Sequence, residues 1–362
     1  MAGSILYLVP DLLGLKGGIA HYGRLVCQAL SQSAFSLDVL SLIDRDPGDD
    51  SFANDMGINY QPCHGSRTFF VRQALATTLR HRPLIILVGH PNFSSLGWCL
   101  ARISGAQLVV FIYGIDVFKP LAMNRRWALR RANQIISISQ FTARQAVRTN
   151  RISPERIRIL HNCLNPRLGT LTSSVRSEEN LSMLTVGRLS VYEQYKGHDY
   201  VIRSMPALLA RFPNLIYHIV GDGDWRPTLE RLAEQTQVSH AVRFHGMVSE
   251  ESLMQHYANA DVFIMPSRGE GFGFVFLEAM AHAKPVIGGN VDATPEVIVD
   301  GVTGYLVNPT SVESIVDAAS QLLGNAELRR QMGQAAVQHV NQNFGFDKFK
   351  HQLNAYLAEL KA

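Results

Sequence analysis

Two glutamates and three glycines stand together in the segment of residues 266–280, directly after a predicted buried strand. The segment becomes helical from about Phe274, so it places backbone N–H groups and a helix N-terminus at a strand end, where an anion can bind. Glu270 and Glu278 lie eight residues apart, and their carboxylates can hold two different hydroxyl-bearing groups. The pattern predicts a site for an anionic, hydroxyl-rich ligand, and a glycine-rich turn with a capping glutamate is the alternative.

Short apolar runs alternate with helix-length amphipathic segments, which is the pattern of βαβ units on a parallel sheet. The predicted strands cover residues 5–9, 37–42, 84–88, 108–112, 135–137, 183–186, 216–220, 242–244, 262–265 and 285–287. A polar stretch at 170–180 separates the two series. We therefore expect an α/β protein of two doubly wound, Rossmann-like domains, 1–168 and 169–344, with a C-terminal helix at 345–362 returning to the first. Two such domains would face each other across an interdomain cleft, with ligands at the carboxyl ends of the strands.

The composition excludes several other classes of protein. With 362 residues and 46% hydrophobic content, the chain can bury a core in each of two domains. Its four cysteines form no CxxC pair and its histidines show no metal-ligand spacing, so neither a zinc site nor a disulfide framework is predicted. No apolar run approaches the roughly 20 residues that span a bilayer, and residues 5–9 resemble a first strand more than a signal peptide. We expect a cytoplasmic protein.

The charge is unevenly distributed along the chain. Residues 1–165 hold 18 Lys and Arg against nine Asp and Glu, whereas residues 166–362 hold 16 against 21. A basic half can meet a phosphorylated substrate, anionic lipid or nucleic acid. Because no repeated aromatic pattern or nucleic-acid-binding motif accompanies these charges, no nucleic-acid partner is expected.

One part of the sequence resembles the retaining glycosyltransferases of family 4, whose two-domain architecture is called GT-B. It consists of the segment EGFGFVFLEAM, residues 270–280, and the residues that follow it to Gly304. The resemblance covers nearly the whole chain. It implies that Glu278 binds the ribose of a sugar nucleotide and that Glu270 binds hydroxyls of the transferred sugar. The loop residues that it implies for donor binding are Gly271, Phe272, Gly273, Phe274 and Val275.

Two cations in the second domain resemble the family's Arg and Lys pair. Arg188 follows the first strand of this domain, and Lys196 precedes its first helix. By this resemblance they neutralise the diphosphate leaving group as the anomeric C–O bond breaks. They lie eight positions apart, which is longer than the family spacing, and a surface ion pair is the alternative for either one.

The first domain carries the expected acceptor side. Gly17 and Gly18 follow the first strand and resemble the family's glycine loop, where acceptor and β-phosphate approach the backbone closely. Tyr113 stands where the family commonly has a histidine that touches the transferred sugar, and Asp116 follows it. Tyrosine can donate or accept a hydrogen bond but does not titrate near neutral pH. His90 follows the predicted strand at 84–88 and is expected to look into the cleft.

Asp222 and Asp224 form a DxD sequence, the metal-binding signature of a different glycosyltransferase fold. Here they fall in a turn after the predicted strand at 216–220, and family 4 enzymes have a similar turn. We therefore predict no metal site and no cofactor beyond the UDP- or GDP-sugar donor.

The resemblance implies a retaining, metal-independent hexosyltransferase that acts on a saccharide or lipid-linked saccharide in bacterial-type polysaccharide or glycoconjugate synthesis. Two alternatives stay open. One is an epimerase or phosphorylase of the same architecture. The other is a catalytically silent sugar-nucleotide-binding subunit, suggested by Tyr113.

Two basic stretches of the first domain predict peripheral contact with the inner face of an anionic membrane. A solvated basic surface is the alternative. The basic residues are Arg72, Arg80, His81 and Arg82 in one stretch, and Arg125, Arg126, Arg130 and Arg131, beside Trp127 and Leu129, in the other.

Overall fold

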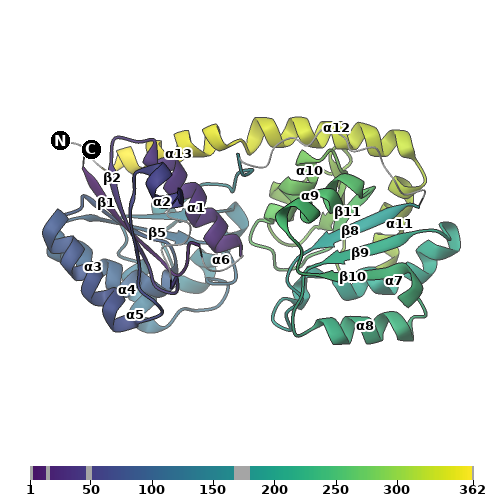
Figure 1. Ribbon diagram of the computed structural model, residues 1–362, viewed down its shortest axis with the longest axis horizontal. Coiled ribbons are helices and arrows are strands. Elements are labelled where there is room, and N and C mark those ends of the chain that lie inside the picture. The colour runs from purple at the N-terminus through teal and green to yellow at the C-terminus, as the bar shows by residue number, and fades with distance from the viewer. Residues whose placement is uncertain (1–2, 14–16, 46–50, 167–179, 361–362) are drawn as a thin grey trace. The chain divides into compact units, whose positions relative to one another are not determined.

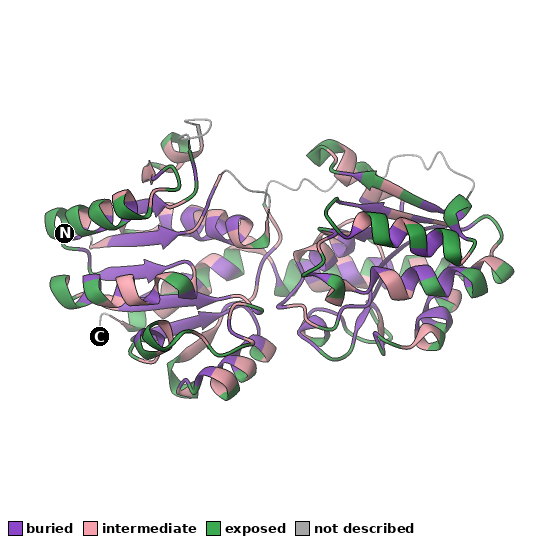
Figure 2. Cartoon of the chain, turned by 90° about the horizontal axis from the view of Figure 1, so that it is seen from below, coloured by how far each residue is buried: buried purple, intermediate pink, exposed green. Residues whose placement is uncertain are grey.

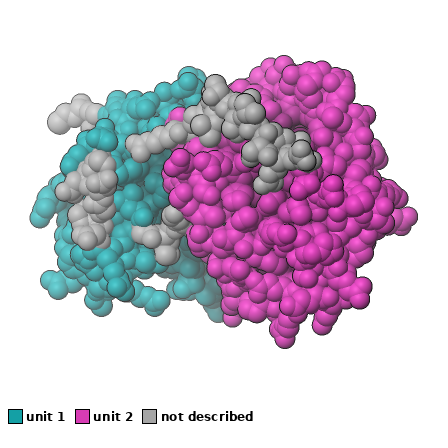
Figure 3. Space-filling view, turned by 45° about the vertical axis from the view of Figure 1, so that its right-hand side comes forward, with its two compact units in different colours: residues 1–162, 346–362 teal, residues 163–345 magenta. Residues whose placement is uncertain are grey.

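The computed structural model describes residues 3–13, 17–45, 51–166 and 180–360. The chain forms two compact units, shown in Figure 3: residues 1–162 with 346–362 (unit 1), and residues 163–345 (unit 2). The predicted boundary at 168–169 lies outside the described residues.

Unit 1 is built on a seven-stranded parallel sheet with strand order β3-β2-β1-β4-β5-β6-β7. From the neighbouring strands β1 and β4 the order runs outward in both directions, through β2 and β3 on one side and through β5 to β7 on the other. Figure 1 labels β1, β2 and β5 of this sheet. The strands are β1 (Ser4–Val9), β2 (Ser36–Ser41), β3 (Asn59–Pro62), β4 (Ile85–Val88), β5 (Gln107–Ile112), β6 (Gln134–Ser137) and β7 (Ile157–Ile159).

Helices cover both faces of this sheet. The helix α4 contacts both α3 and α5, whereas α1 packs against α13. The helices are α1 (Gly18–Ser31), α2 (Ser51–Met56), α3 (Arg67–His81), α4 (Ser94–Ser104), α5 (Met123–Leu129), α6 (Gln140–Asn150) and α13 (Phe346–Glu359). The C-terminal helix α13 is part of unit 1, where the ring of Phe349 meets that of Tyr22 with centroids 5.5 Å apart.

Unit 2 is built on a six-stranded parallel sheet with strand order β10-β9-β8-β11-β12-β13. Its strands are β8 (Ser182–Val186), β9 (Ile216–Val220), β10 (Val242–Gly246), β11 (Val262–Met265), β12 (Val286–Gly289) and β13 (Gly304–Val307). Its helices are α7 (His198–Arg211), α8 (Arg226–Gln235), α9 (Glu250–Asn259), α10 (Phe274–Ala281), α11 (Val312–Leu323) and α12 (Ala326–Asn343). The helix α7 contacts α8 and α11, whereas α10 packs against α12.

Most interior strands are buried along nearly their whole length, as Figure 2 shows. All four residues of β4 and all four of β11 are buried, because helices cover both faces of a parallel sheet. This is why their apolar runs predicted strands. None of the helices in the described ranges combines the length and the apolar character that a bilayer span requires.

Three strands were not predicted, and all three are edge strands: β3 and β7 in unit 1 and β13 in unit 2. They have three or four residues, and β3 and β7 have no buried residue. A short, half-exposed edge strand lacks the apolar run that identifies a central strand.

Candidate functional site

The loop between β11 and α10 is held in place by a buried aspartate. Asp292, 5% exposed, accepts hydrogen bonds at Oδ2 from the Ser267 hydroxyl and the Glu270 backbone N–H, both at 2.7 Å. Its Oδ1 accepts one from the Thr294 N–H at 2.9 Å. Asp292 follows β12, the strand beside β11, so it fixes the glycine-rich loop from the neighbouring strand end.

The start of α10 requires a glycine. Gly273, at the N-cap, has φ +93°, and a Cβ there would lie 2.6 Å from the Phe276 ring. Gly273 has no side chain that could cap the helix. The predicted donor loop of Gly271, Phe272, Gly273, Phe274 and Val275 therefore places backbone N–H groups at the helix N-terminus, which is the geometry expected for an anion site.

The two predicted cations converge on a buried glutamate. Glu193, whose side chain is 7% exposed, forms ion pairs with both Arg188 and Lys196, the latter with Nζ 2.6 Å from Oε2. The Arg188 side chain is 66% exposed, whereas that of Lys196 is 13% exposed. The long spacing between the two cations thus contains the residue that brings them together at the carboxyl end of β8.

Glu270 shares this electrostatic environment. Burial raises the pKa of its carboxyl above the usual range, Lys196 opposes the shift, and the neighbouring Asp292 and Glu193 carboxyls add to it. Arg188, Lys196 and Glu270 come from the loops after β8 and β11, which are neighbours in the sheet. The structure therefore groups the predicted diphosphate-binding and sugar-binding residues in one place.

Glu278 points toward a different partner. The Tyr257 hydroxyl, from α9, donates a hydrogen bond of 2.7 Å to Glu278 Oε2. Burial raises the pKa of the Glu278 carboxyl, and the hydrogen bond from Tyr257 opposes this shift. Tyr257 is buried and stacks on His282, so Glu278 is oriented by a packed aromatic pair that sequence inspection did not single out.

Both aspartates of the DxD sequence have hydrogen-bond or ion-pair partners in the protein. Asp222 Oδ1 accepts a hydrogen bond from the Gly223 N–H at 2.8 Å, and Asp222 Oδ2 lies 3.5 Å from Arg226 Nη1. Asp224 Oδ1 accepts from the Val191 N–H at 2.9 Å. These contacts give the two aspartates a structural part in the loops after β8 and β9.

In unit 1 the predicted residues follow β1, β4 and β5, which are adjacent in the sheet. Gly17 and Gly18 form the start of α1, with Gly17 in an extended conformation at the N-cap. A Cβ at Gly17 would meet nothing within 4 Å among the described residues. The surrounding protein thus leaves room at Gly17.

Tyr113 directs its hydroxyl inward. The hydroxyl oxygen is buried beside that of Tyr7, and the ring meets Tyr22 edge-on with centroids 5.4 Å apart. Burial, followed by the Asp116 charge, raises the pKa of Tyr113 well above its ordinary value. Both carboxylate oxygens of Asp116 accept from the Tyr113 N–H at 3.1 Å, so Asp116 holds this turn.

His90 caps the short helical turn Pro91–Phe93, with Nδ1 accepting from the Asn92 N–H at 3.1 Å. Burial, with a smaller effect of Arg125, lowers the pKa of His90 to about 4. The ring is therefore neutral near pH 7, and since Nδ1 accepts a hydrogen bond, Nε2 carries the proton and can donate one.

Solved structures define the class of fold. A glycosyltransferase from Rickettsia africae superimposes with a TM-score of 0.83 at 15% identity, covering 99% of this chain and 98% of that one. Anabaena Alr3699/HepE in complex with UDP-glucose superimposes with a TM-score of 0.78 at 18% identity, covering 99% and 100%. Two Rossmann-like units of this kind are the GT-B fold, as predicted.

Two family models match the chain. The model described as "Glycosyltransferase Family 4" matches residues 16–168, and the one described as "Glycosyl transferases group 1" matches residues 172–339. This chain belongs to glycosyltransferase family 4, which confirms the resemblance.

Curated relatives match over part of their length. An uncharacterized glycosyltransferase of Methanocaldococcus jannaschii is 31% identical over 62% of this chain and 59% of its own. A GDP-mannose-dependent α-(1-6)-phosphatidylinositol monomannoside mannosyltransferase of Mycolicibacterium smegmatis is 40% identical over 39% of this chain and 38% of its own. The chain thus spans between about two fifths and three fifths of these relatives.

Proposed function

We propose that this chain is a retaining glycosyltransferase that moves a hexose from a UDP- or GDP-sugar to a saccharide or lipid-linked saccharide acceptor in the synthesis of a polysaccharide or glycoconjugate. The observation that carries the proposal is the cluster at the strand ends of unit 2, where Arg188 and Lys196 meet beside Glu270. The cations match a diphosphate, and the carboxylate matches sugar hydroxyls. Both the GDP-mannose-dependent relative and the UDP-glucose complex are consistent with such a donor.

The chemistry proposed for the site is electrostatic. Arg188 and Lys196 stabilise the negative charge that develops on the diphosphate as the anomeric C–O bond breaks. The acceptor hydroxyl attacks from the face that the diphosphate leaves, a phosphate oxygen takes its proton, and the anomeric configuration is retained. Glu270 positions the sugar through its hydroxyls, and Glu278 holds the ribose. Positioning and charge stabilisation replace a protein nucleophile in this scheme.

A panel of sugar nucleotides, with and without saccharide acceptors, tests the proposal through release of UDP or GDP. A transferase releases nucleotide together with a glycosylated acceptor. A sugar nucleotide that changes its sugar configuration while the nucleotide stays attached would indicate an epimerase. Binding without turnover of any donor would indicate a silent subunit, a reading that the inward-facing Tyr113 hydroxyl favours.

Turnover is expected to be insensitive to EDTA, because Asp222 and Asp224 are engaged by Arg226 and by backbone N–H groups of the loops after β8 and β9. The measurement is the initial rate of transfer before and after chelation, with and without added Mn²⁺. Loss of activity in EDTA and its recovery with Mn²⁺ would contradict metal independence and return attention to these two aspartates.

We also propose peripheral contact with anionic lipid through α3, which has an exposed apolar stripe. Val71, Leu75 and Leu79 recur at every fourth position and are 45%, 38% and 59% exposed. Arg72 and Arg80 are exposed on the same helix. A basic and apolar helix face of this kind suits the lipid interface, and it would bring unit 1 to a lipid-linked acceptor.

The second basic stretch supports this proposal only in part. Trp127 is 41% exposed on α5, and the Arg131 guanidinium lies 3.9 Å from its ring centroid. Leu129, expected to share an apolar surface with Trp127, is instead buried in the core of unit 1, because it lies on the side of α5 that faces the sheet.

Co-sedimentation with vesicles tests the lipid contact. We expect binding to phosphatidylserine-containing vesicles at low salt and release at high salt, since each basic residue near the surface contributes about 1 kcal/mol and is screened over a Debye length. The double variant Arg72→Glu, Arg80→Glu should bind at least about tenfold more weakly. Arg231→Glu, on exposed α8 of unit 2, is the control. Equal binding to neutral and anionic vesicles would contradict the electrostatic contact and favour a soluble acceptor.

A further inference from the structure

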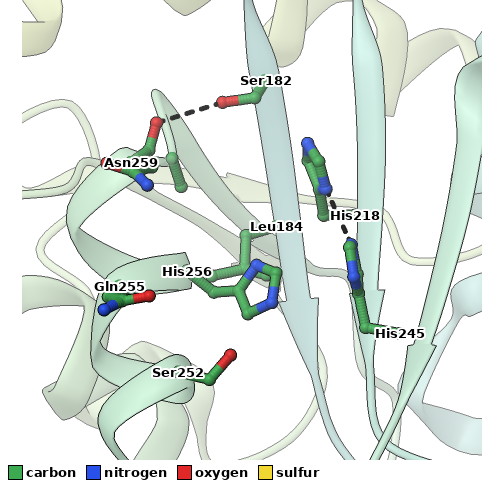
Figure 4. A pocket seen from close by; sticks show the side chains of 9 residues that line it. Ser182, Leu184, His218, His245, Ser252, Gln255, His256 and Asn259 are labelled. Atoms are coloured by element: carbon green, nitrogen blue, oxygen red, sulfur yellow. Dashed lines mark hydrogen bonds between the residues drawn. The ribbon is translucent and has the colours of Figure 1, made fainter. Parts of the chain in front are cut away.

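Three histidines from three different elements of unit 2 meet at one end of its sheet. His218 lies on β9, His245 on β10 and His256 on α9, and one ring nitrogen from each lies within 4.8 Å of the other two. Figure 4 shows the two strand histidines beside each other, with His256 reaching toward them from the helix. In the described ranges of the chain, this is the one group of three or more His, Cys, Asp or Glu residues with such spacing.

The sheet itself brings His218 and His245 together. β9 and β10 are parallel neighbours, and their register skips one residue: Phe244 pairs with Ile219, and Gly246 pairs with Val220. His245 is the residue left out of this register, and such an irregularity can redirect a side chain. Its Nε2 lies 2.9 Å from His218 Nδ1, and the two rings stack with an interplanar angle of 18°.

A cavity of about 150 Å³ lies at the three rings. Besides the histidines, its lining includes Ser252 and Gln255 from α9. A cavity of this size can hold an ion together with a water molecule. The three rings therefore border a polar space that can admit a ligand, which a closed stack of aromatic rings could not do.

The chemistry of the three side chains suits a cation. Each ring offers one nitrogen to the shared space, and imidazole is the commonest protein metal ligand.

We propose that His218, His245 and His256 form a binding site for a divalent first-row transition ion, with Zn²⁺ as the ion that the ligand set fits best. Three histidine nitrogens and a water molecule give Zn²⁺ its usual four ligands. The proposal is independent of the glycosyl transfer proposed above, and the ion has no part in that reaction.

The geometry requires only small adjustments. Ligand nitrogens at about 2.0–2.1 Å from a tetrahedral Zn²⁺ are about 3.3 Å apart. His218 Nδ1 and His245 Nε2, now 2.9 Å apart, must therefore move apart by a few tenths of an ångström. The other pairs of ligand nitrogens are at most 4.8 Å apart, so none must approach by more than about 1.5 Å. One of His218 Nδ1 and His245 Nε2 now carries the proton of their hydrogen bond. When the ion binds, that proton moves to the other nitrogen of the same ring, so each ring keeps one N–H that points away from the ion.

The ion would tie the helix α9 to the paired strands β9 and β10. β10 is the edge strand of the sheet, His245 on it is exposed, and Tyr257 is the one buried residue of α9. Linking β9, β10 and α9 through one ion would stabilise the folded state, because the ion binds a site that the unfolded chain lacks. Arg243 supplies a positive charge nearby, which should make the site weaker than one completed by a carboxylate.

The test uses the chain without a histidine tag, stripped with EDTA and dialysed free of chelator, and titrated with ZnCl₂ by calorimetry. We expect one Zn²⁺ per chain and a higher melting temperature with zinc. Titration with Co²⁺ should give the visible absorption typical of tetrahedral nitrogen coordination.

Single variants at the cluster identify the site. His245→Ala and His256→Ala should each weaken zinc binding by at least about 100-fold, since loss of a group that merely supports a ligand already costs 10- to 100-fold. His240 is exposed and lies outside the cluster, so the control variant His240→Ala should bind zinc as the wild type does. Glutamine replacements at 245 and 256 provide a second pair of variants should the alanine variants unfold.

The outcomes are distinct from those of the transfer reaction. Turnover of a sugar nucleotide, where it is observed, should be the same in His245→Ala and in wild type, so failure of one proposal does not carry over to the other. Absence of saturable zinc binding by the wild-type chain, or equal affinity in wild type, His245→Ala and His256→Ala, would overturn the site.

Discussion

We expect Glu270→Gln to lose turnover by at least about 100-fold while it binds free UDP or GDP as tightly as the wild type. The proposed role of Glu270 is to hold the transferred sugar, which free nucleotide lacks. Glutamine preserves the shape of the side chain, and the backbone N–H of residue 270 can still donate to Asp292. Initial rates of transfer and calorimetric titration with free nucleotide measure the two effects separately.

Glu278→Gln should show the opposite behaviour and weaken nucleotide binding by about 1.5–3 kcal/mol, the range for a hydrogen bond to a charged group. Tyr257→Phe provides a milder comparison, since it keeps the Glu278 carboxylate and removes the hydroxyl that donates to it at 2.7 Å. Equal losses of free-nucleotide affinity in Glu270→Gln and Glu278→Gln would contradict the division of roles between sugar and ribose.

Removal of either cation should slow the chemical step more than it weakens donor binding. For Arg188→Ala and for Lys196→Met we expect kcat to fall by about 2–4 kcal/mol of barrier, the size found for preorganised groups that stabilise developing charge. The measurement is kcat and KM for the donor under saturating acceptor. Arg203→Ala, at an exposed position of α7, is the control and should leave both constants unchanged.

The two cation variants should differ in stability. Lys196 is largely buried against Glu193, so Lys196→Met leaves that buried carboxylate with Arg188 as its remaining ion-pair partner and should lower the melting temperature. Arg188 is mostly exposed, so its removal should change stability little. A higher KM for the donor in both variants, with kcat unchanged, would contradict a role of the two cations in the transition state.

The signals that predicted the donor residues are local in sequence. Glu270, the glycines and Glu278 lie within one strand-loop-helix segment, and a strand end followed by a helix N-terminus is defined by adjacent residues. The residues that hold this segment were missed because their contacts are long-range. Asp292 lies 25 positions from Ser267, and Tyr257 lies 21 positions from Glu278. The sequence showed Glu193 only as one of the residues between Arg188 and Lys196, whose spacing is unusually long, and gave no sign of its ion pairs with them.

The two series of buried parallel strands, and the position of the predicted site residues just after them, followed from the sequence alone. A strand covered on both faces must be apolar along its length, and this requirement is written in consecutive residues. Tertiary structure alone decided the direction of the Tyr113 hydroxyl, the burial of Leu129 and the pairing of both cations with Glu193. It also brought His218, His245 and His256 together, although their spacing along the chain predicted no metal site, because strand pairing and helix packing join residues that no local pattern connects.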